Sequence, residues 1–257
     1  MLAVCIAGAG NALFHLGGGS VALRLKRGFA APAGIFVAPG AVGVLLGTLL
    51  GESGFSALWT GALLLGMFSV LLLVHEAPMP QPRDRPERPL RRGRLILLLL
   101  LISVAMRSLL SLALSFPPTL APLLLLTGAL GKGWGGVLAD RFGWMRTAVC
   151  ALMMSIPLLM FGTASHGEKI LAMFLVSTTM PVALAAVSES LPGEPAFAFG
   201  LTGFALLVGV LPGFSHLRPL AGIREPMVAA AVVCALALCF GLRLAHLSDS
   251  PQPQSAE

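Results

Sequence analysis

Two basic residues lie inside apolar stretches of the sequence, where a charge is costly. Arg107 falls about twelve residues into its run, or ~18 Å along a helix, and Lys132 lies in a glycine-rich run. An unpaired charge inside a membrane costs at least a few kcal/mol, so such residues are usually functional. These stretches contain no Asp or Glu, which predicts a cavity that favours anionic or carboxylate-bearing solutes. The alternative is that Lys132 snorkels to the interface and Arg107 bonds to backbone carbonyls.

A second polar pair, Asn11 and His15, is four residues apart and therefore lies on one helix face. A titratable histidine inside an apolar helix can couple proton movement to transport. Hydrogen bonding to a neighbouring helix is the alternative interpretation, and the spacing alone does not decide between the two.

Motifs of ordinary enzyme chemistry are missing from the sequence. We find no Ser-His-Asp set, P-loop, HExxH or pair of catalytic carboxylates. Cys5, Cys150, Cys234 and Cys239 lie in apolar stretches without CxxC spacing or a histidine partner, which favours small buried hydrophobes over a metal or redox site. We therefore expect no enzyme, no metal and no cofactor.

Composition places these residues in a membrane protein. The chain has 257 residues, of which 56% are hydrophobic and 11% charged, with a mean hydropathy of +0.90. Soluble domains are roughly 45–50% apolar and about 25% charged. The net charge of +6 comes largely from basic residues clustered in short loops, which indicates topology rather than a nucleic-acid partner. The sequence predicts an all-α polytopic protein in the lipid bilayer.

Apolar runs separated by charged, proline and glycine residues predict nine transmembrane helices. The expected spans are residues 2–22, 30–50, 55–75, 95–115, 119–139, 147–164, 170–190, 197–214 and 226–246. If the segment 76–94, with its prolines and six arginines, is cytoplasmic, twelve Lys and Arg fall on that side and three on the other. Because cytoplasmic loops are enriched in these residues, we expect the N-terminus outside and the C-terminus in the cytoplasm.

Glycine spacing makes a further prediction in the second span. Gly40, Gly43, Gly47 and Gly51, with Pro39, put small residues near one helix face. Small residues let transmembrane helices approach closely, and proline permits a bend. We therefore expect this face to pack against another helix or to accommodate a bend.

The turn at residues 136–146, GVLADRFGWMR, combines small and charged residues between two spans. Small residues there let two helices approach closely, and Asp140 can accept hydrogen bonds from the N-terminus of a neighbouring helix. Arg141 and Arg146 can hold a carboxylate across the bundle. Glu189, at the end of a later span, is the expected carboxylate, and a solvated loop residue is the alternative.

This turn resembles the signature loop G-x-L-A-D-R-x-G-R-R/K of the major facilitator superfamily. The matching positions are Gly136, Leu138, Ala139, Asp140, Arg141 and Gly143. Trp144 and Met145 replace the usual basic pair, and Arg146 follows one place late. Residues 10–27 likewise resemble the fourth helix of drug and fosmidomycin-resistance-type members. The resemblance implies that Gly136, Asp140, Arg141, Gly143, Arg146 and Glu189 gate the cytoplasmic side.

The resemblance also implies a domain organisation. Residues 1–75 would be a partial N-terminal bundle of three spans, 76–94 the cytoplasmic linker, 95–247 a six-helix C-terminal bundle and 248–257 a cytoplasmic tail. The family's first three helices would then be missing. Two interpretations stay open, a coding region that starts late and a shortened relative that works as a homo-oligomer.

The implied function is transport of a small organic solute across the bacterial inner membrane. We expect efflux by alternating access, with proton coupling as a further option, and Arg107, Lys132, His15 and Asn11 as the solute or proton residues. One alternative is a non-transporting scaffold or sensor that keeps the fold. Another is an intramembrane enzyme that uses Arg107 and Lys132 on a lipid phosphate.

Overall fold

The computed structural model describes residues 1–73, 93–113, 120–161, 166–214 and 224–249. These residues form nine α-helices and the 3-10 helix η2, and they contain no strand. The helices are α1 (Leu2–Leu25), α2 (Ala31–Glu52), α3 (Ala57–Leu73), α4 (Gly93–Ala113), α5 (Ala121–Phe142), α6 (Trp144–Phe161), α7 (His166–Ser190), α8 (Pro195–Val210) and α9 (Arg224–Asp249), with η2 at Leu211–Phe214. The linker 76–92 and the tail 250–257 lie outside the described residues.

Six helical segments in the described part of the chain are long and apolar enough to cross a membrane. They are Leu2–Leu25, Ala31–Glu52, Gly93–Ser111, His166–Ser190, Pro195–Phe214 and Glu225–His246. The prediction of an all-helical, membrane-embedded protein is confirmed. Each of the nine α-helices overlaps one expected span, but α3 and α6 have shorter apolar stretches and α5 is not among the six. That all nine helices cross a membrane stays a prediction.

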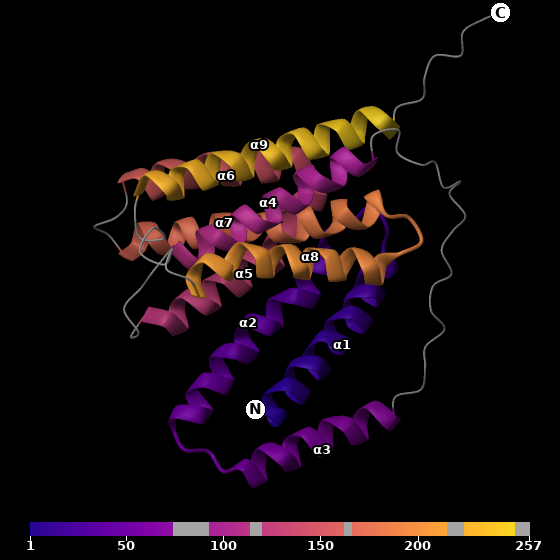
Figure 1. Ribbon diagram of the computed structural model, residues 1–257, viewed down its shortest axis with the longest axis vertical. Helices are drawn as coiled ribbons and strands as arrows, with labels where there is room; N and C mark the ends of the chain where they lie inside the picture. Colours follow the sequence, from indigo (N-terminus) through magenta and orange to yellow (C-terminus); the bar gives the residue numbers. More distant parts are fainter. Residues whose placement is uncertain (74–92, 114–119, 162–165, 215–223, 250–257) are drawn as a thin grey trace, which may run out of the picture.

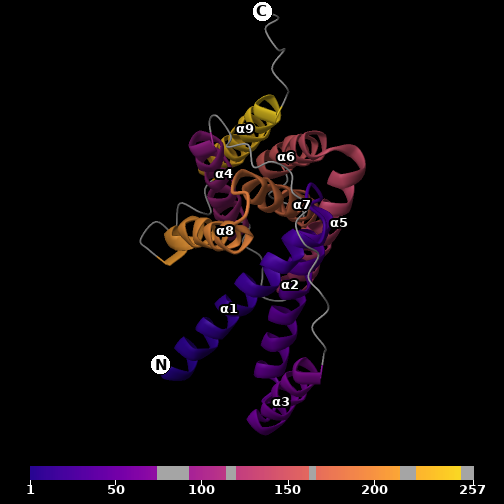
Figure 2. The same ribbon diagram turned by 90° about the vertical axis from the view of Figure 1, so that its right-hand side faces the viewer.

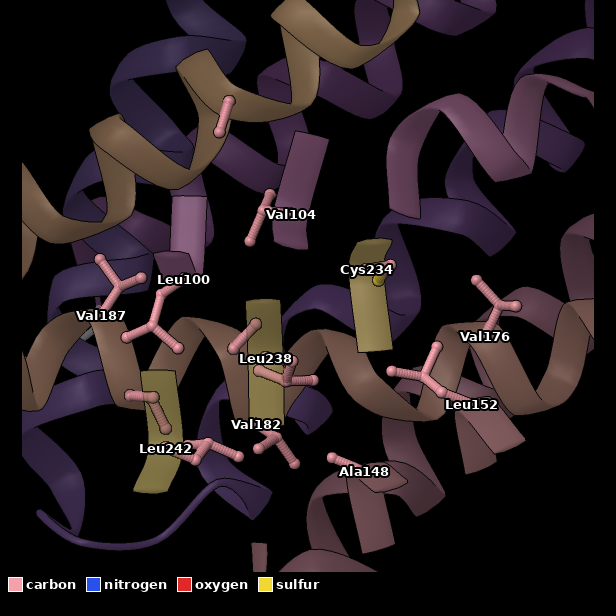
Figure 3. Packing of buried hydrophobic residues seen from close by; sticks show 14 of the residues in the cluster. Leu100, Val104, Ala148, Leu152, Val176, Val182, Val187, Cys234, Leu238 and Leu242 are labelled. Carbon is pink, nitrogen blue, oxygen red and sulfur yellow. The ribbon is translucent and has the colours of Figure 1, made fainter. Parts of the chain in front are cut away.

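Helices α4 to α9 form a bundle around α7 (Figure 1). Helix α7 packs against α4, α5, α6 and α8, and 72% of its most apolar 18-residue window is buried. Figure 3 shows part of the core, in which Leu100 and Val104 of α4, Val182 of α7, and Cys234 and Leu238 of α9 lie together. Helix α7 is therefore the central helix of the bundle.

Helices α1 and α2 are attached to this bundle at one end only. Their buried residues are Gly19, Ala22 and Leu23 near the end of α1, and Ala33 and Gly34 near the start of α2. From there both helices lead away from the bundle toward α3 (Figures 1 and 2). Every side chain of α3 that the structure describes is exposed.

Glycines bring α5 into backbone contact with helices on two of its sides. A Cβ at Gly131 would lie 2.6 Å from the Phe174 carbonyl oxygen of α7, and one at Gly136 would lie 2.7 Å from that of Ala30 beside α2. A Cβ at Gly135 would meet the carbonyl of Thr178. Real Cβ atoms do not approach this closely, so these glycines permit the packing of α5 between α2 and α7.

The outer part of α2 differs from this pattern. A Cβ at Gly40, Gly43, Gly47 or Gly51 would meet no described atom within 4 Å. The expectation that this glycine face packs closely is therefore wrong for the described residues. The physical reason is that the buried residues of α2, Ala33 and Gly34, lie at its start, whereas every residue from Gly47 to Glu52 is exposed.

Candidate functional site

The turn between α5 and α6 begins at Gly143, which has a φ of 95° and donates its N–H to the Ala139 carbonyl oxygen. Only glycine adopts this backbone conformation at low cost. The turn lets α6 start at Trp144 directly after α5 ends. Trp144 donates its indole N–H to Asp140 Oδ1 over 3.2 Å, so the turn also fixes the orientation of the Asp140 carboxylate.

Asp140 caps the N-terminus of α2 from across the molecule. Ala30 donates its N–H to Oδ1 over 2.7 Å, and Ala31 donates its N–H to Oδ2 over 2.8 Å. Helix α2 lacks a cap of its own because its N-cap residue is Ala30, and a helix N-terminus leaves free N–H groups and a partial positive charge. The expectation that Asp140 accepts hydrogen bonds from a neighbouring helix N-terminus is confirmed.

Glu189, in the last turn of α7, also binds the segment that precedes α2. Its Oε1 accepts a hydrogen bond of 3.0 Å from the N–H of Gly28, whose φ is 78°. Within the described ranges no ion pair joins Glu189 to Arg141 or Arg146, so the expectation of such a pair is wrong. Both arginines are exposed, and the Arg141 guanidinium lies 5.6 Å from the Phe142 ring centroid.

We name the contacts of Asp140 and Glu189 with the backbone N–H groups of Gly28, Ala30 and Ala31 the acidic clasp. The two carboxylates come from α5 and α7 of the bundle, and the three donors come from the turn between α1 and α2. The acidic clasp therefore joins the first two helices to the bundle through charge-assisted hydrogen bonds, which are stronger than neutral ones.

Arg107 lies inside the bundle with 5% of its surface exposed. Its Nη2 donates to the Met180 sulfur of α7 over 2.8 Å, and its Nε has no partner among the described residues. A guanidinium has five N–H donors, and a thioether is a weak acceptor. Hydrogen bonds from Arg107 to backbone carbonyls, the alternative considered above, do not occur among the described residues.

Lys132 lies in the middle of α5, half-buried, and within electrostatic reach of Arg107. A Cβ at Gly34 of α2 would lie 2.5 Å from the Lys132 carbonyl oxygen and 3.1 Å from Cβ of Pro181, the residue after Met180. No carboxylate of the described segments forms a salt bridge with Arg107 or Lys132. Arg107 of α4 and Lys132 of α5 thus lie on two helices that both pack against α7.

His15 lies at a different place, where α1 contacts α2 and α8. Its Nδ1 lies 2.9 Å from the backbone carbonyl oxygen of Asn11, whose own side chain is exposed. The His15 ring centroid is 6.0 Å from that of Phe36 in α2 and 6.1 Å from that of Phe199 in α8. In the part of the chain that the structure describes, His15 therefore contacts aromatic rings rather than Arg107 or Lys132.

Three residues of these sites were missed by the sequence reasoning. Met180 was one of many methionines, and Phe36 and Phe199 had no distinguishing neighbours in the sequence. We call the contact of His15 with the Phe36 and Phe199 rings the aromatic joint. The adjacent glycines give the only sequence signal for it, because a Cβ at Gly18 would meet the Phe36 ring and one at Gly19 the Phe199 ring.

Comparison of the chain with protein-family models, curated proteins and solved structures gives no match. Among the described residues no group of three His, Cys, Asp or Glu could hold a metal ion. What the chain does must therefore be argued from the acidic clasp, the buried cations and the aromatic joint.

Proposed function

We propose that the chain is a transport protein of the major facilitator type that moves a small organic solute across a membrane. The observation that carries the proposal is the buried Arg107, together with the half-buried Lys132, in the middle of an apolar helical bundle. Ionisable residues at membrane depth mark substrate or ion pathways far more often than they serve packing.

The arrangement of the helices supports this proposal. Alternating access needs two bodies that meet around a midplane site and separate at one end at a time. The pair α1 and α2 meets the bundle at the acidic clasp and at the aromatic joint, while the start of α1 and the end of α2 are exposed. This fits a transporter closed at the clasp end, which the basic loops place on the cytoplasmic side.

The placement of Asp140 supports the family assignment. The signature-like loop joins α5 and α6, the second and third helices after the basic linker. A hydrogen-bonded contact between a carboxylate and a helix N-terminus is reversible, because water can replace each bond at modest net cost. The acidic clasp is then a gate, and His15 in the joint between α1, α2 and α8 is the proton-coupling residue.

Flux through reconstituted protein tests the proposal. Liposomes with and without the protein are loaded in parallel with a cationic dye, ethidium, an anionic dye, carboxyfluorescein, and a set of small carboxylates and amines. We expect at least one solute to leave faster than from empty liposomes, with or without a pH gradient. Arg107→Ala should slow that flux at least about tenfold, with unchanged helicity and elution volume.

A control variant removes a charge outside the site. Arg243 lies near the end of α9 and is exposed, so Arg243→Gln should leave the flux unchanged. Flux that is equal in protein-containing and empty liposomes for every solute, or equal in wild type and Arg107→Ala, contradicts the transport proposal.

The exposed helix α3 favours a second candidate, a non-transporting membrane scaffold or sensor. All its described side chains, including Leu58, Trp59 and Phe68, are exposed and apolar or small, and such a surface is suited to partner helices. A scaffold predicts partner binding that is unaffected by Arg107→Ala and lost when residues of α3 are replaced. A pull-down from detergent-solubilised membranes separates the two candidates.

A further inference from the structure

We infer that Arg107 and Lys132 together bind the carboxylate of an anionic organic solute, an inference that rests on the proposed function for the role of that solute as cargo. Arg107 comes from α4 and Lys132 from α5, and the Met180 sulfur of α7 is the acceptor that Arg107 uses in this structure. Three points support the inference. The Arg107 guanidinium has N–H donors without acceptors, no Asp or Glu lies at this depth in the sequence, and Met180, the present acceptor, is easily displaced.

The donors of Arg107 are largely unused. One Nη2 bond to a sulfur is the only hydrogen bond that its guanidinium makes with the described residues, and the buried Nε makes none. The hydroxyls nearest in the chain are engaged elsewhere, because Ser111 donates to the Arg107 carbonyl oxygen and Ser108 to that of Leu206. A buried donor without an acceptor is costly, so the site favours an incoming acceptor.

The sequence holds no counter-charge at this depth. Its 11 Asp and Glu residues all lie near helix ends, in the linker or in the tail. Those in the described residues are Glu52, Asp140, Glu168, Glu189, Glu194, Glu225 and Asp249. Of these, Asp140 and Glu189 are already engaged in the acidic clasp. No carboxylate of the described residues therefore offsets the charges of Arg107 and Lys132.

The geometry favours a carboxylate over a compact anion. A guanidinium is a planar fork that matches two carboxylate oxygens, whereas a lysine ammonium acts as a point charge that any oxygen satisfies. The Met180 thioether is flexible and accepts weakly, so a carboxylate displaces it readily. The neighbouring residues along α4 and α7 include Val104 and Val182, which are buried and apolar.

Thermal unfolding in nanodiscs tests this inference without requiring transport. The protein is placed in nanodiscs of phosphatidylcholine, and benzoate, acetate, inorganic phosphate and neutral benzamide are added separately. A ligand that binds only the folded state raises Tm in proportion to its saturation. We expect benzoate to raise Tm by a few degrees, acetate and phosphate to act less, and benzamide to have no effect.

Apolar variants separate binding from a structural role. Arg107→Met removes the unpaired charge and puts a shorter, unbranched and flexible side chain in its place, so it should raise Tm without ligand and abolish the benzoate response. Lys132→Met should weaken the benzoate response at least about tenfold in concentration. Arg243→Gln, the exposed control, should keep the wild-type response.

Three results overturn the inference. The first is a Tm unaffected by benzoate, acetate and phosphate. The second is an Arg107→Met variant that is less stable than wild type and still responds to benzoate, which makes Arg107 structural. The third is stabilisation only when anionic phosphatidylglycerol is added to the nanodisc, which makes the anion a lipid headgroup instead of a solute.

The two proposals fail separately. A benzoate response without flux of any solute retains the anion site and rejects transport. Flux of ethidium that is unaffected by carboxylates retains transport and rejects the anion site.

Discussion

Helices α5 and α2 are both rich in glycine, but their glycines lie in opposite surroundings. In α5, Gly131 and Gly135 contact carbonyls of α7, and Gly136 contacts the start of α2. In α2, Gly34 packs on α5, whereas a Cβ from Gly40 to Gly51 would meet only open space. Regularly spaced small residues therefore mark a helix that another helix can approach closely. The position of the neighbouring helices decides whether such an approach occurs.

The boundary between the two environments falls inside a single helix. Gly34 and Gly40 are less than two turns apart, yet only Gly34 faces another backbone. The acidic clasp contributes to this difference, since it holds the first turn of α2 against α5. Ala38 still lies beside Gly133 of α5, and farther along the chain α2 leads away from the bundle (Figure 2).

The largest effect is expected from a methyl group in the packed region. In Gly135→Ala the new Cβ meets the backbone of Thr178, which cannot move independently of α7. Overpacking of this kind costs about 1–3 kcal/mol, and a bulkier side chain costs more. A shift in the SDS or thermal unfolding midpoint measures it. A midpoint equal to wild type for both Gly135→Ala and Gly135→Val would show that α5 and α7 are not in backbone contact.

An intermediate effect is expected from the acidic clasp. Asp140→Ala removes the cap of α2 and leaves the N–H groups of Ala30 and Ala31 without their acceptors, which costs about 1 kcal/mol. Asp140→Asn keeps one acceptor and should cost less. Hydrogen exchange at the two amides should accelerate in that order. Glu189→Gln is the matched control, because it affects only the Gly28 amide. Unchanged exchange in Asp140→Ala would rule out the capping contact.

The smallest effect is expected from the open region. Gly47→Ala adds a methyl group where no described atom lies within 4 Å, and alanine favours a helix over glycine by about 1 kcal/mol in water. We expect an unfolding midpoint equal to or slightly above that of wild type. A clear decrease, comparable with that of Gly135→Ala, would mean that this face is packed in the membrane and would remove the contrast between the two helices.

The parts of the structure that depend on local sequence were predictable. Apolar runs indicated the helices, and the capping role of Asp140 followed from the attraction between a carboxylate and a helix N-terminus. The absence of carboxylates around Arg107 and Lys132 could also be read from the sequence, and the anion site that it indicates stays a prediction. Each of these conclusions needs only residues close in sequence or a general rule about charge.

The parts that depend on which elements meet were not predictable. Glu189 was expected to pair with an arginine, but the Gly28 amide lies nearer and takes its oxygen. Met180 as the acceptor of Arg107, and Phe36 and Phe199 around His15, result from the crossing of helices far apart in sequence. Helix contacts in a membrane have little hydrophobic signal, because lipid is as apolar as leucine.

The acidic clasp has a consequence for sequence change. All three of its donors are main-chain amides, so replacing Ala31 by any residue except proline leaves its donor in place. The strength of this contact therefore depends on the side chains of Asp140 and Glu189 rather than on that of Ala31. Ala30 differs, because it is fully buried and its backbone lies against Gly136. We expect relatives of the chain to differ at Ala31 without any compensating change at Asp140, so that covariation between these two positions is weak even though they touch.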